Sequence, residues 1–230
     1  MHPRTTGQLC LTSAVLPARP PRPKGHRAFT LIELLAVIAI IVILVGLLFP
    51  AFKAVQNQAR QTQAKNDLTQ IVNAVNAFYT DYGKYPLATG ITTDYTYGPG
   101  GNLATNQTLF TELRGCTAVA GSCPAAATIN TRLIPFISPP DVKNSASPRS
   151  GIGTAAGNMG QYFDPWGSNY VIRIDGEYNN QVTNPYTTNA GGNPLQLGVV
   201  ALSLGSDQAG GIGSADKNAG AAADDVISWQ

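Results

Sequence analysis

The chain has 230 residues, of which 43% are hydrophobic, and this is enough for one domain with a core. Its 15 basic and 13 acidic residues are unevenly spread: five basic side chains and no acidic one precede residue 29, which leaves 10 basic against 13 acidic groups after it. This balance argues against nucleic acid as the main partner. Because both histidines, His2 and His26, also precede residue 29, the remainder lacks Ser-His-Asp and Cys-His catalytic sites and histidine-ligated metal sites. We therefore do not expect an enzyme.

The first element is a basic leader, residues 1–28, followed by an apolar run from Phe29 to Phe49. At about 1.5 Å per residue the run spans roughly 31 Å, close to the ~30 Å hydrocarbon core of a bilayer. The positive-inside rule places the leader in the cytoplasm and the C-terminal part outside. A secretory signal peptide is an alternative, but its apolar core is shorter and a small-x-small cleavage site follows it, which PAFK at residues 50–53 matches poorly.

One acidic residue, Glu33, stands inside this apolar run. A carboxylate in a membrane span costs free energy, less near the end of the span than at its centre, and it needs a partner. A plain membrane anchor, the simplest alternative, leaves Glu33 unexplained. Cleavage between Ala28 and Phe29 creates a new amine one helical turn before Glu33, on the same helix or on that of a neighbour. The acid is then a candidate for joining subunits.

Ala28 followed by FTLIELL (residues 29–35) resembles the cleavage and methylation motif of type IV prepilins and type II secretion pseudopilins. The resemblance implies that a membrane aspartyl peptidase cuts before Phe29 and methylates its nitrogen. It also implies that Glu33, fifth in the mature chain, guides assembly. The family usually has Gly before the cut, whereas Ala28 stands here and the nearest glycine is Gly25. Cleavage after Gly25 shifts Glu33 by three places, so we expect cleavage after Ala28.

A second helical segment follows Pro50, which is residue 22 when Phe29 is counted as the first. Many pilins have a helix-loosening proline there, although a proline can also end a membrane helix. Beyond it, apolar residues recur mostly every three or four positions up to Gly83: Phe52, Val55, Ala59, Leu68, Ile71, Val75, Phe78 and Tyr82. We predict a membrane and assembly helix over 29–50, a kink or weak turn at Pro50, and an amphipathic continuation over 51–83.

Residues 84–161 are rich in Gly, Thr, Asn, Ala and Pro and contain only short apolar runs, so we expect a variable, loop-rich insertion at the surface. It contains Cys116 and Cys123. In an exported chain, two cysteines so close together suggest a short disulfide loop, although a reduced pair is also possible.

Residues 162–230 alternate short β-branched or apolar runs with turn residues, as in an antiparallel sheet. The runs are 171–174, 197–205 and 225–229. A long helix packed on a small antiparallel sheet is an α+β fold. We therefore expect a long N-terminal helix on a β-sheet head that ends in a C-terminal loop, as in type IV pilin-like proteins.

Three short motifs in this head, DPWG with Tyr170, SLGSD at 203–207 and DDVISW at 224–229, are similar to the major pseudopilin of type II secretion. In that family the C-terminal loop holds calcium. Carried over by motif, the ligands are the Leu204 carbonyl and the carboxylates of Asp207 and of one or both of Asp224 and Asp225, with the part of Asp216 left open. Calcium prefers six to eight oxygen ligands, which such a loop can supply. From composition alone, a solvated acidic loop is the alternative.

These features predict a structural filament subunit, the major pseudopilin of a type II secretion system, whose polymerisation drives protein export. The alternative is a type IV pilin of a surface pilus for adhesion, motility or DNA uptake. The expected partners are further copies of the chain, a prepilin peptidase and methyltransferase, an inner-membrane assembly platform and minor pseudopilins. The expected location is the inner membrane, crossed once, with a periplasmic head and assembly into a periplasmic filament.

Overall fold

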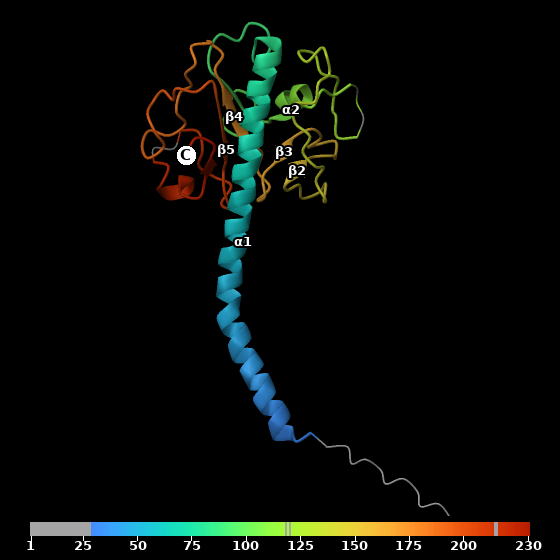
Figure 1. Ribbon diagram of the computed structural model, residues 1–230, viewed down its shortest axis with the longest axis vertical. Helices are drawn as coiled ribbons and strands as arrows, with labels where there is room; N and C mark the ends of the chain where they lie inside the picture. The colour runs from blue at the N-terminus through green and yellow to red at the C-terminus, as the bar shows by residue number, and fades with distance from the viewer. Residues whose placement is uncertain (1–28, 118, 120, 214–215) are drawn as a thin grey trace, which may run out of the picture. The chain divides into compact units, whose positions relative to one another are not determined.

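The computed structural model describes residues 29–230 apart from 118, 120, 214 and 215, and for residues 49–51 it describes the backbone alone. The predicted leader, including Ala28, lies outside the described residues. The chain divides into two units, Met1–Phe49 and Pro50–Gln230. Helix α1, Leu31–Tyr82, begins in the first unit and ends in the second (Figure 1).

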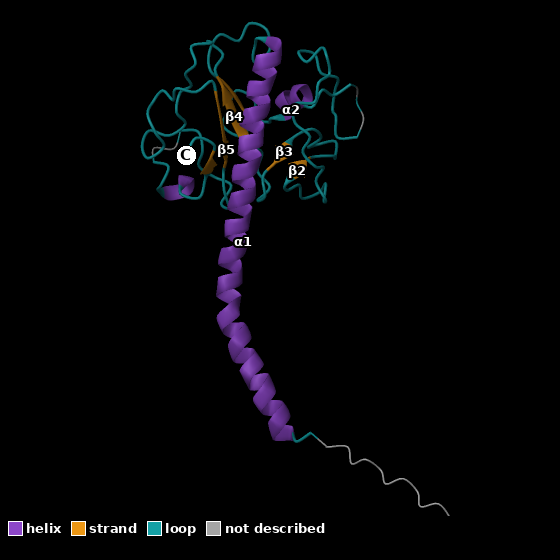
Figure 2. Cartoon of the chain, viewed as in Figure 1, coloured by secondary structure: helices purple, strands orange, loops and turns teal. Residues whose placement is uncertain are grey.

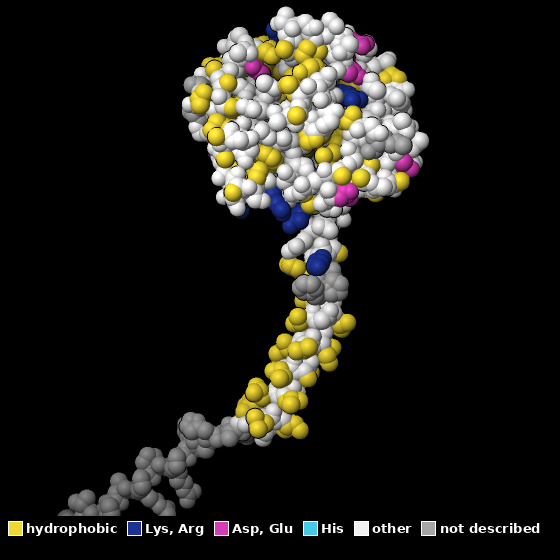
Figure 3. All heavy atoms as spheres, turned by 180° about the vertical axis from the view of Figure 1, so that it is seen from behind, with side chains coloured by type: hydrophobic (Ala, Val, Ile, Leu, Met, Phe, Trp, Pro, Cys, Tyr) yellow, Lys and Arg dark blue, Asp and Glu magenta, His cyan; other side chains and the backbone are white. Residues whose placement is uncertain are grey.

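The first part of α1 is a continuous apolar helix. Its described side chains from Leu31 to Leu48 are exposed, and Figure 3 shows hydrophobic side chains along it. The helix is long and apolar enough to cross a membrane, which makes it compatible with a single-pass anchor. Because the helix continues through Pro50, the membrane helix does not end at this proline. A loosening of the helix at Pro50 stays a prediction.

The second part of α1 buries one face. Its buried side chains recur every three or four residues, as one face of a helix requires: Ala64, Leu68, Ile71, Ala74, Val75 and Phe78. Phe52 and Val55, which the sequence pattern placed on the same face, are 59% and 65% exposed. The face that packs on the head therefore begins near Ala64, about three turns after the apolar pattern itself begins.

The sheet of the head has four antiparallel strands in the order β1-β4-β5-β6. Figure 2 labels β4 and β5. Their bounds are Tyr95–Tyr97 for β1, Val171–Ile174 for β4, Val199–Ser203 for β5 and Val226–Ile227 for β6. Strands β2, Gly151–Ile152, and β3, Tyr162–Phe163, form a separate antiparallel pair. A 3-10 helix, Gly220–Ala222, precedes β6.

The two faces of the sheet belong to two hydrophobic clusters. Ile172 and Ile174 of β4 pack in the cluster that contains Leu68 and Phe78 of α1. Val171, the odd-numbered residue directly before Ile172, packs with Leu202 and other residues in a second cluster. This alternation follows from the two-residue period of a strand. The predicted α+β architecture, a long N-terminal helix with a small antiparallel sheet, is confirmed.

Residues 84–161 differ from the surface insertion that their composition suggests. Strand β1 adds a fourth strand to the sheet, so the sheet does not begin at residue 162. Helix α2, Gln107–Leu113, buries Leu109, Phe110 and Leu113 in the cluster that also holds α1. These elements escape detection because three strand residues and a seven-residue helix are too short to show a period. The segment is therefore part of the core of the head.

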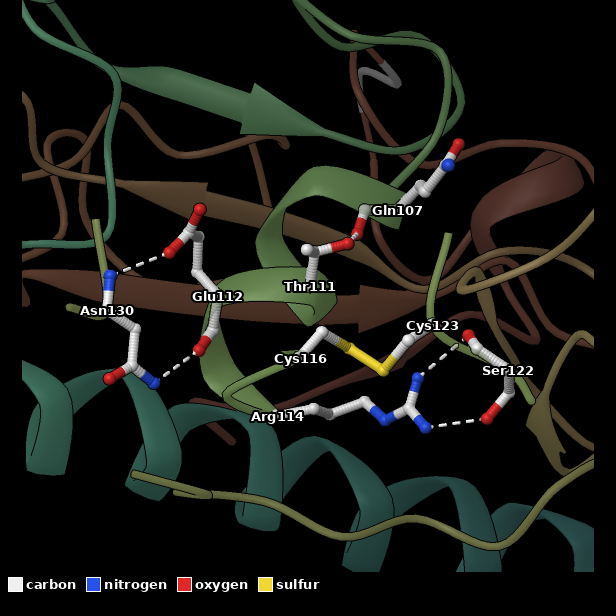
Figure 4. The surroundings of a disulfide bond; sticks show 8 residues. All are labelled: Gln107, Thr111, Glu112, Arg114, Cys116, Ser122, Cys123 and Asn130. Atoms are coloured by element: carbon white, nitrogen blue, oxygen red, sulfur yellow. Dashed lines mark hydrogen bonds between the residues drawn. A yellow bond between two sulfur atoms is a disulfide. The ribbon is translucent and has the colours of Figure 1, made fainter. Parts of the chain in front are cut away.

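A buried carboxylate fixes the loop that follows α2. Glu112, 6% exposed, accepts the backbone N–H groups of Thr128, Ile129 and Asn130 over 2.8, 2.9 and 2.7 Å. The side-chain amide of Asn130 donates to the carbonyl of Glu112. The side-chain oxygen of Asn130 accepts a hydrogen bond from the Tyr82 hydroxyl of α1 over 2.6 Å. Figure 4 shows the Glu112–Asn130 pair. The end of α1, α2 and this loop are thus linked by one hydrogen-bond network.

Asp67 is an acidic residue on the buried face of α1. It is 8% exposed, and the Tyr170 hydroxyl donates to its Oδ2 over 2.8 Å. Burial raises the pKa of Asp67, and the hydrogen bond from Tyr170 offsets part of this rise. The folded head therefore holds the Asp67 proton more tightly than the unfolded chain does.

The raised pKa of Asp67 gives a pH prediction. Protonated Asp67 contributes stability that is fully present below the pKa of about 4 that an aspartate has in the unfolded chain. This contribution is lost as the pH rises through the higher pKa of Asp67 in the folded head. The free energy of unfolding should therefore fall more steeply with rising pH, from about pH 4 upward, in the wild type than in Asp67→Asn. Urea unfolding of the mature protein in detergent at a series of pH values measures this. Parallel curves for the two proteins would contradict it.

Candidate assembly site and C-terminal loop

The N-terminus of α1 carries a capping box made by Thr30 and Glu33. The Thr30 backbone N–H and hydroxyl each donate to Glu33 Oε2 over 2.9 Å, and the Glu33 N–H donates to Thr30 Oγ over 3.3 Å. The Thr30 carbonyl accepts the first helical bond, from Leu34, over 3.2 Å. This is the T-x-x-E pattern in which two side chains satisfy the free N–H groups of a helix end. Sequence reasoning overlooked Thr30, although the pattern is visible in FTLIELL.

The capping box places the Glu33 carboxylate at the first turn of the apolar helix. Both Thr30 donors reach the same oxygen, and within the described residues Glu33 Oε1 has no donor. Phe29 directly precedes the cap and is 76% exposed. An amine formed at Phe29 therefore lies within about one helical turn of a carboxylate oxygen that can accept a further bond. The same oxygen can equally accept an amine from another subunit.

Processing at this end gives a prediction. We expect the mature chain to begin at Phe29 with a methylated nitrogen, because this cut places a free amine one turn before Glu33. Intact-mass measurement and N-terminal peptide mass spectrometry of membrane-extracted protein check it. A mature chain that begins at His26, or an uncut leader, would show that Ala28 and Phe29 are not the processing site.

In the head, Asp164 joins two of the motifs that the sequence analysis singled out. Its Oδ1 accepts the N–H groups of Trp166, Gly167 and Ser168 over 2.9, 2.7 and 2.9 Å. Its Oδ2 accepts the Ser203 hydroxyl over 2.5 Å. Asp164 is fully buried, and burial raises its pKa while these bonds lower it. The DPWG turn is thus fixed to the SLGSD segment 39 residues later.

The C-terminal loop contains the residues predicted to bind calcium. Asp224 Oδ2 accepts the Ser206 N–H and hydroxyl, both over 2.6 Å, and the Asp207 N–H over 3.1 Å. Asp207 turns its own Oδ1 to the N–H of Ala209 over 2.9 Å. The structure therefore brings Asp224 to the SLGSD segment, with N–H and O–H donors at one carboxylate oxygen.

Asp225 faces away from this contact. It is 5% exposed; its Oδ2 accepts the Tyr186 hydroxyl over 2.6 Å and the Gly211 N–H over 2.8 Å, while its buried Oδ1 has no donor within the described residues. Asp216 bonds instead to Asn189, over 2.7 Å.

The carboxylates of this loop do not gather around one point. Among the described residues, no three His, Cys, Asp or Glu side chains come together in a way that could hold a metal. Calcium binding here stays a prediction from the resemblance.

Cys116 and Cys123 form a disulfide with an S–S distance of 1.99 Å and a Cα–Cα distance of 5.7 Å (Figure 4). Arg114, at the end of α2, spans the loop they close: its guanidinium donates to the Ser122 carbonyl over 3.1 Å and to the Ser122 hydroxyl over 2.6 Å. The Cys116 N–H donates to the Thr111 carbonyl of α2 over 3.2 Å. The disulfide loop is thus attached to the end of α2.

We expect this disulfide in the exported protein, since thiols outside the cytoplasm are commonly oxidised. Peptide mapping of membrane-extracted protein without reducing agent should recover a peptide pair that joins Cys116 to Cys123. Recovery of both as free thiols, or of a cross-link between two subunits, would contradict the expectation. Reduction before digestion is the control that releases the pair.

The comparisons with known proteins bear on the N-terminal end. The model of the prokaryotic N-terminal methylation motif matches residues 23–49, which include Ala28, Phe29, Glu33 and the apolar start of α1. Neither the comparison with curated proteins nor that with solved structures found a match. Proteins with this motif are structural subunits, processed by a prepilin peptidase and assembled into filaments. With this motif in front of a long apolar helix and a small antiparallel sheet, the chain combines a prepilin-type methylation motif with a pilin-like α+β fold.

Proposed function

We propose that the chain is the major pseudopilin of a type II secretion system, a subunit that polymerises through its N-terminal helix and drives protein export. The observation that best supports a pseudopilin rather than a pilin is the hydrogen bond of 2.5 Å from the Ser203 hydroxyl to Asp164. It joins the DPWG turn to the SLGSD segment, and both resemble the major pseudopilin. Two motifs that meet in space support the assignment more strongly than two motifs that merely share an order.

The N-terminal helix suits a subunit that first lies in the membrane and then assembles into a filament. Its apolar side chains from Leu31 to Leu48 are exposed, so they need either lipid or the helices of other subunits around them. In the membrane, Oε2 of Glu33 accepts both hydrogen bonds from Thr30 of its own chain. In a filament, the methylated amine of Phe29 from a neighbouring copy is a stronger partner, because opposite charges attract more strongly in an apolar environment. Assembly then joins the subunits through Glu33.

The topology follows from the distribution of charge. Five basic residues precede the apolar helix, so the leader stays in the cytoplasm and the head lies in the periplasm. The partners of this proposal are further copies of the chain, a prepilin peptidase and methyltransferase, the inner-membrane assembly platform and minor pseudopilins.

A surface type IV pilus is the second candidate. The observation that favours it is the size of the segment 84–161, which supplies β1 and α2 to the head and closes a disulfide loop where Val119 is 72% exposed. A head enlarged in this way suits a fibre that meets a surface. In this reading the same N-terminal helix and Glu33 assemble the fibre.

A deletion strain complemented with the wild type or with Glu33→Ala separates the two candidates. For a pseudopilin we expect the deletion to abolish export of secreted proteins into the medium, with surface fibres unchanged. Loss of surface fibres with normal export would establish the pilus instead. If the deletion leaves both export and fibres unchanged, both proposals fail.

A further inference from the structure

The segment of α1 between the apolar run and the head is basic. Residues 50–66 contain Lys53, Arg60 and Lys65 and no acidic residue, whereas residues 67–230 contain seven basic and twelve acidic residues. Figure 3 shows Lys and Arg side chains where α1 leaves the head. The charge that follows the apolar run is thus divided between a positive stretch of helix and a negative head.

Two of these three basic residues lie on the face of α1 that packs on the head. Lys53, Asn57 and Arg60 precede the buried Ala64 at intervals of four, three and four residues, so they continue its face toward the apolar run. Lys53 and Asn57 are exposed, and Arg60 is half-buried. We call Lys53, Asn57 and Arg60 the basic stripe. The face that is apolar against the head is therefore polar and positive in the turns before it.

The third basic residue, Lys65, has a structural role. Its ammonium donates to the carbonyl of Ile227 over 2.7 Å and to that of Gln230, and this fastens the C-terminal segment to α1. Arg60, by contrast, makes no salt bridge within the described residues. A guanidinium presents paired N–H donors whose geometry matches two oxygens of a phosphate. Arg60 is therefore the best phosphate-binding group of the basic stripe.

Exposed apolar side chains accompany the basic stripe. Phe52 and Val55, which flank Lys53 in the sequence, are 59% and 65% exposed. Such a mixture is typical of the bilayer interface, where apolar groups enter the acyl boundary and long basic side chains reach the headgroups. The stripe begins four residues after Phe49, the end of the apolar run, which is about 6 Å along a helix. Its position therefore fits lipid headgroups.

We propose that the basic stripe binds the phosphate groups of anionic phospholipids while the subunit lies in the membrane. An anionic surface attracts the stripe and repels the acidic head, so the stripe supplies the contact that the head itself cannot make. The acidic head of a second copy is the competing partner, but it offers no apolar contact to Phe52 and Val55. The proposal goes beyond the proposed function and holds for either candidate, because both place the apolar helix in a membrane.

Native mass spectrometry of the full mature chain in a neutral detergent tests this, with parallel titrations of phosphatidylglycerol and of zwitterionic phosphatidylcholine. Each basic side chain near an anionic surface contributes about a factor of five in affinity, so the wild type should prefer phosphatidylglycerol about 30-fold. Lys53→Gln and Arg60→Gln should each bind phosphatidylglycerol about fivefold more weakly, and the double variant about 30-fold, with phosphatidylcholine binding unchanged. The matched control combines Lys143→Gln with Arg149→Gln, which removes one exposed lysine and one exposed arginine from the head. It should bind both lipids as the wild type does.

Three results would overturn the proposal. The first is equal affinity of the wild type for the two lipids. The second is a double variant of the stripe that binds phosphatidylglycerol as tightly as the wild type; if that variant also forms fewer filaments, the stripe contacts the acidic head of another copy instead. The third is an equal loss of affinity in the Lys143 and Arg149 control, since binding then follows total charge rather than the stripe. If the double variant of the stripe does not fold, the two single variants decide between the same outcomes.

Discussion

Filaments formed by Glu33→Ala should fall below about one tenth of the wild-type yield, while the amount of subunit in the membrane stays normal. The variant removes a carboxylate from an apolar helix, which makes insertion easier. It also removes the acceptor for the Phe29 amine of a neighbouring subunit. The variant should therefore impair assembly without impairing insertion.

The measurement pairs a count of sheared filaments with quantification of the subunit in the membrane fraction. Glu33→Gln keeps the size and the hydrogen-bonding oxygen but not the charge, so it separates the loss of the ion pair from the loss of the capping box. Glu177→Ala, which removes an exposed carboxylate of the head, is the matched control. A wild-type filament yield from Glu33→Ala would refute the role of Glu33 in assembly. Equal loss of filaments and of membrane-bound subunit would refute it as well.

The sequence predicted the long helix well because its signal is long. An apolar run of 21 residues followed by three- and four-residue spacing up to Tyr82 leaves few alternatives, and α1 indeed ends at Tyr82. Strands β4 and β5 were also predicted, from compact apolar runs at 171–174 and 197–205. The pattern did not predict where α1 starts to pack on the head. Phe52 and Val55 belong to the same three- and four-residue pattern as Leu68, but their side chains are exposed.

The shortest elements, β1 and α2, were missed for a physical reason. Strand β1 and helix α2 are held in place by tertiary contacts: β1 pairs with β4, and Leu109 and Phe110 of α2 are buried in the same cluster as α1. Such contacts override weak local preference. The polar residue Glu112 is buried for the same reason, because the backbone of residues 128–130 supplies its donors.

The two neighbouring acids of the C-terminal loop, Asp224 and Asp225, have different hydrogen-bond partners. Asp224 lies in the turn that follows the 3-10 helix, and Asp225, whose N–H donates to the Ala222 carbonyl over 3.2 Å, directly precedes β6. One carboxylate therefore reaches Ser206 and the other reaches Tyr186.

Asp164→Ala should destabilise the head more than any single surface change. The substitution removes the acceptor of three backbone N–H groups and of the Ser203 hydroxyl, in a position with no exposure to solvent. Leaving buried donors without a partner costs about 1–3 kcal/mol each, partly relieved by water, so we expect a loss of roughly 3–5 kcal/mol. For a chain of this size this lowers the melting temperature by about 10 °C.

The matched variant Asp164→Asn tests whether those hydrogen bonds are the cause. Its side-chain oxygen can still accept from Trp166, Gly167 and Ser168, while its amide can donate to the Ser203 oxygen, so geometry is kept and the charge is lost. We expect Asp164→Asn to lose less than half of what Asp164→Ala loses. Thermal and urea unfolding of the mature protein in detergent, followed by near-ultraviolet circular dichroism, measure both. Equal losses in the two variants would mean that the charge of Asp164, rather than its hydrogen bonds, holds the DPWG turn to Ser203. A loss below about 1 kcal/mol in Asp164→Ala would mean that the turn folds without this anchor, because a single net hydrogen bond already contributes that much.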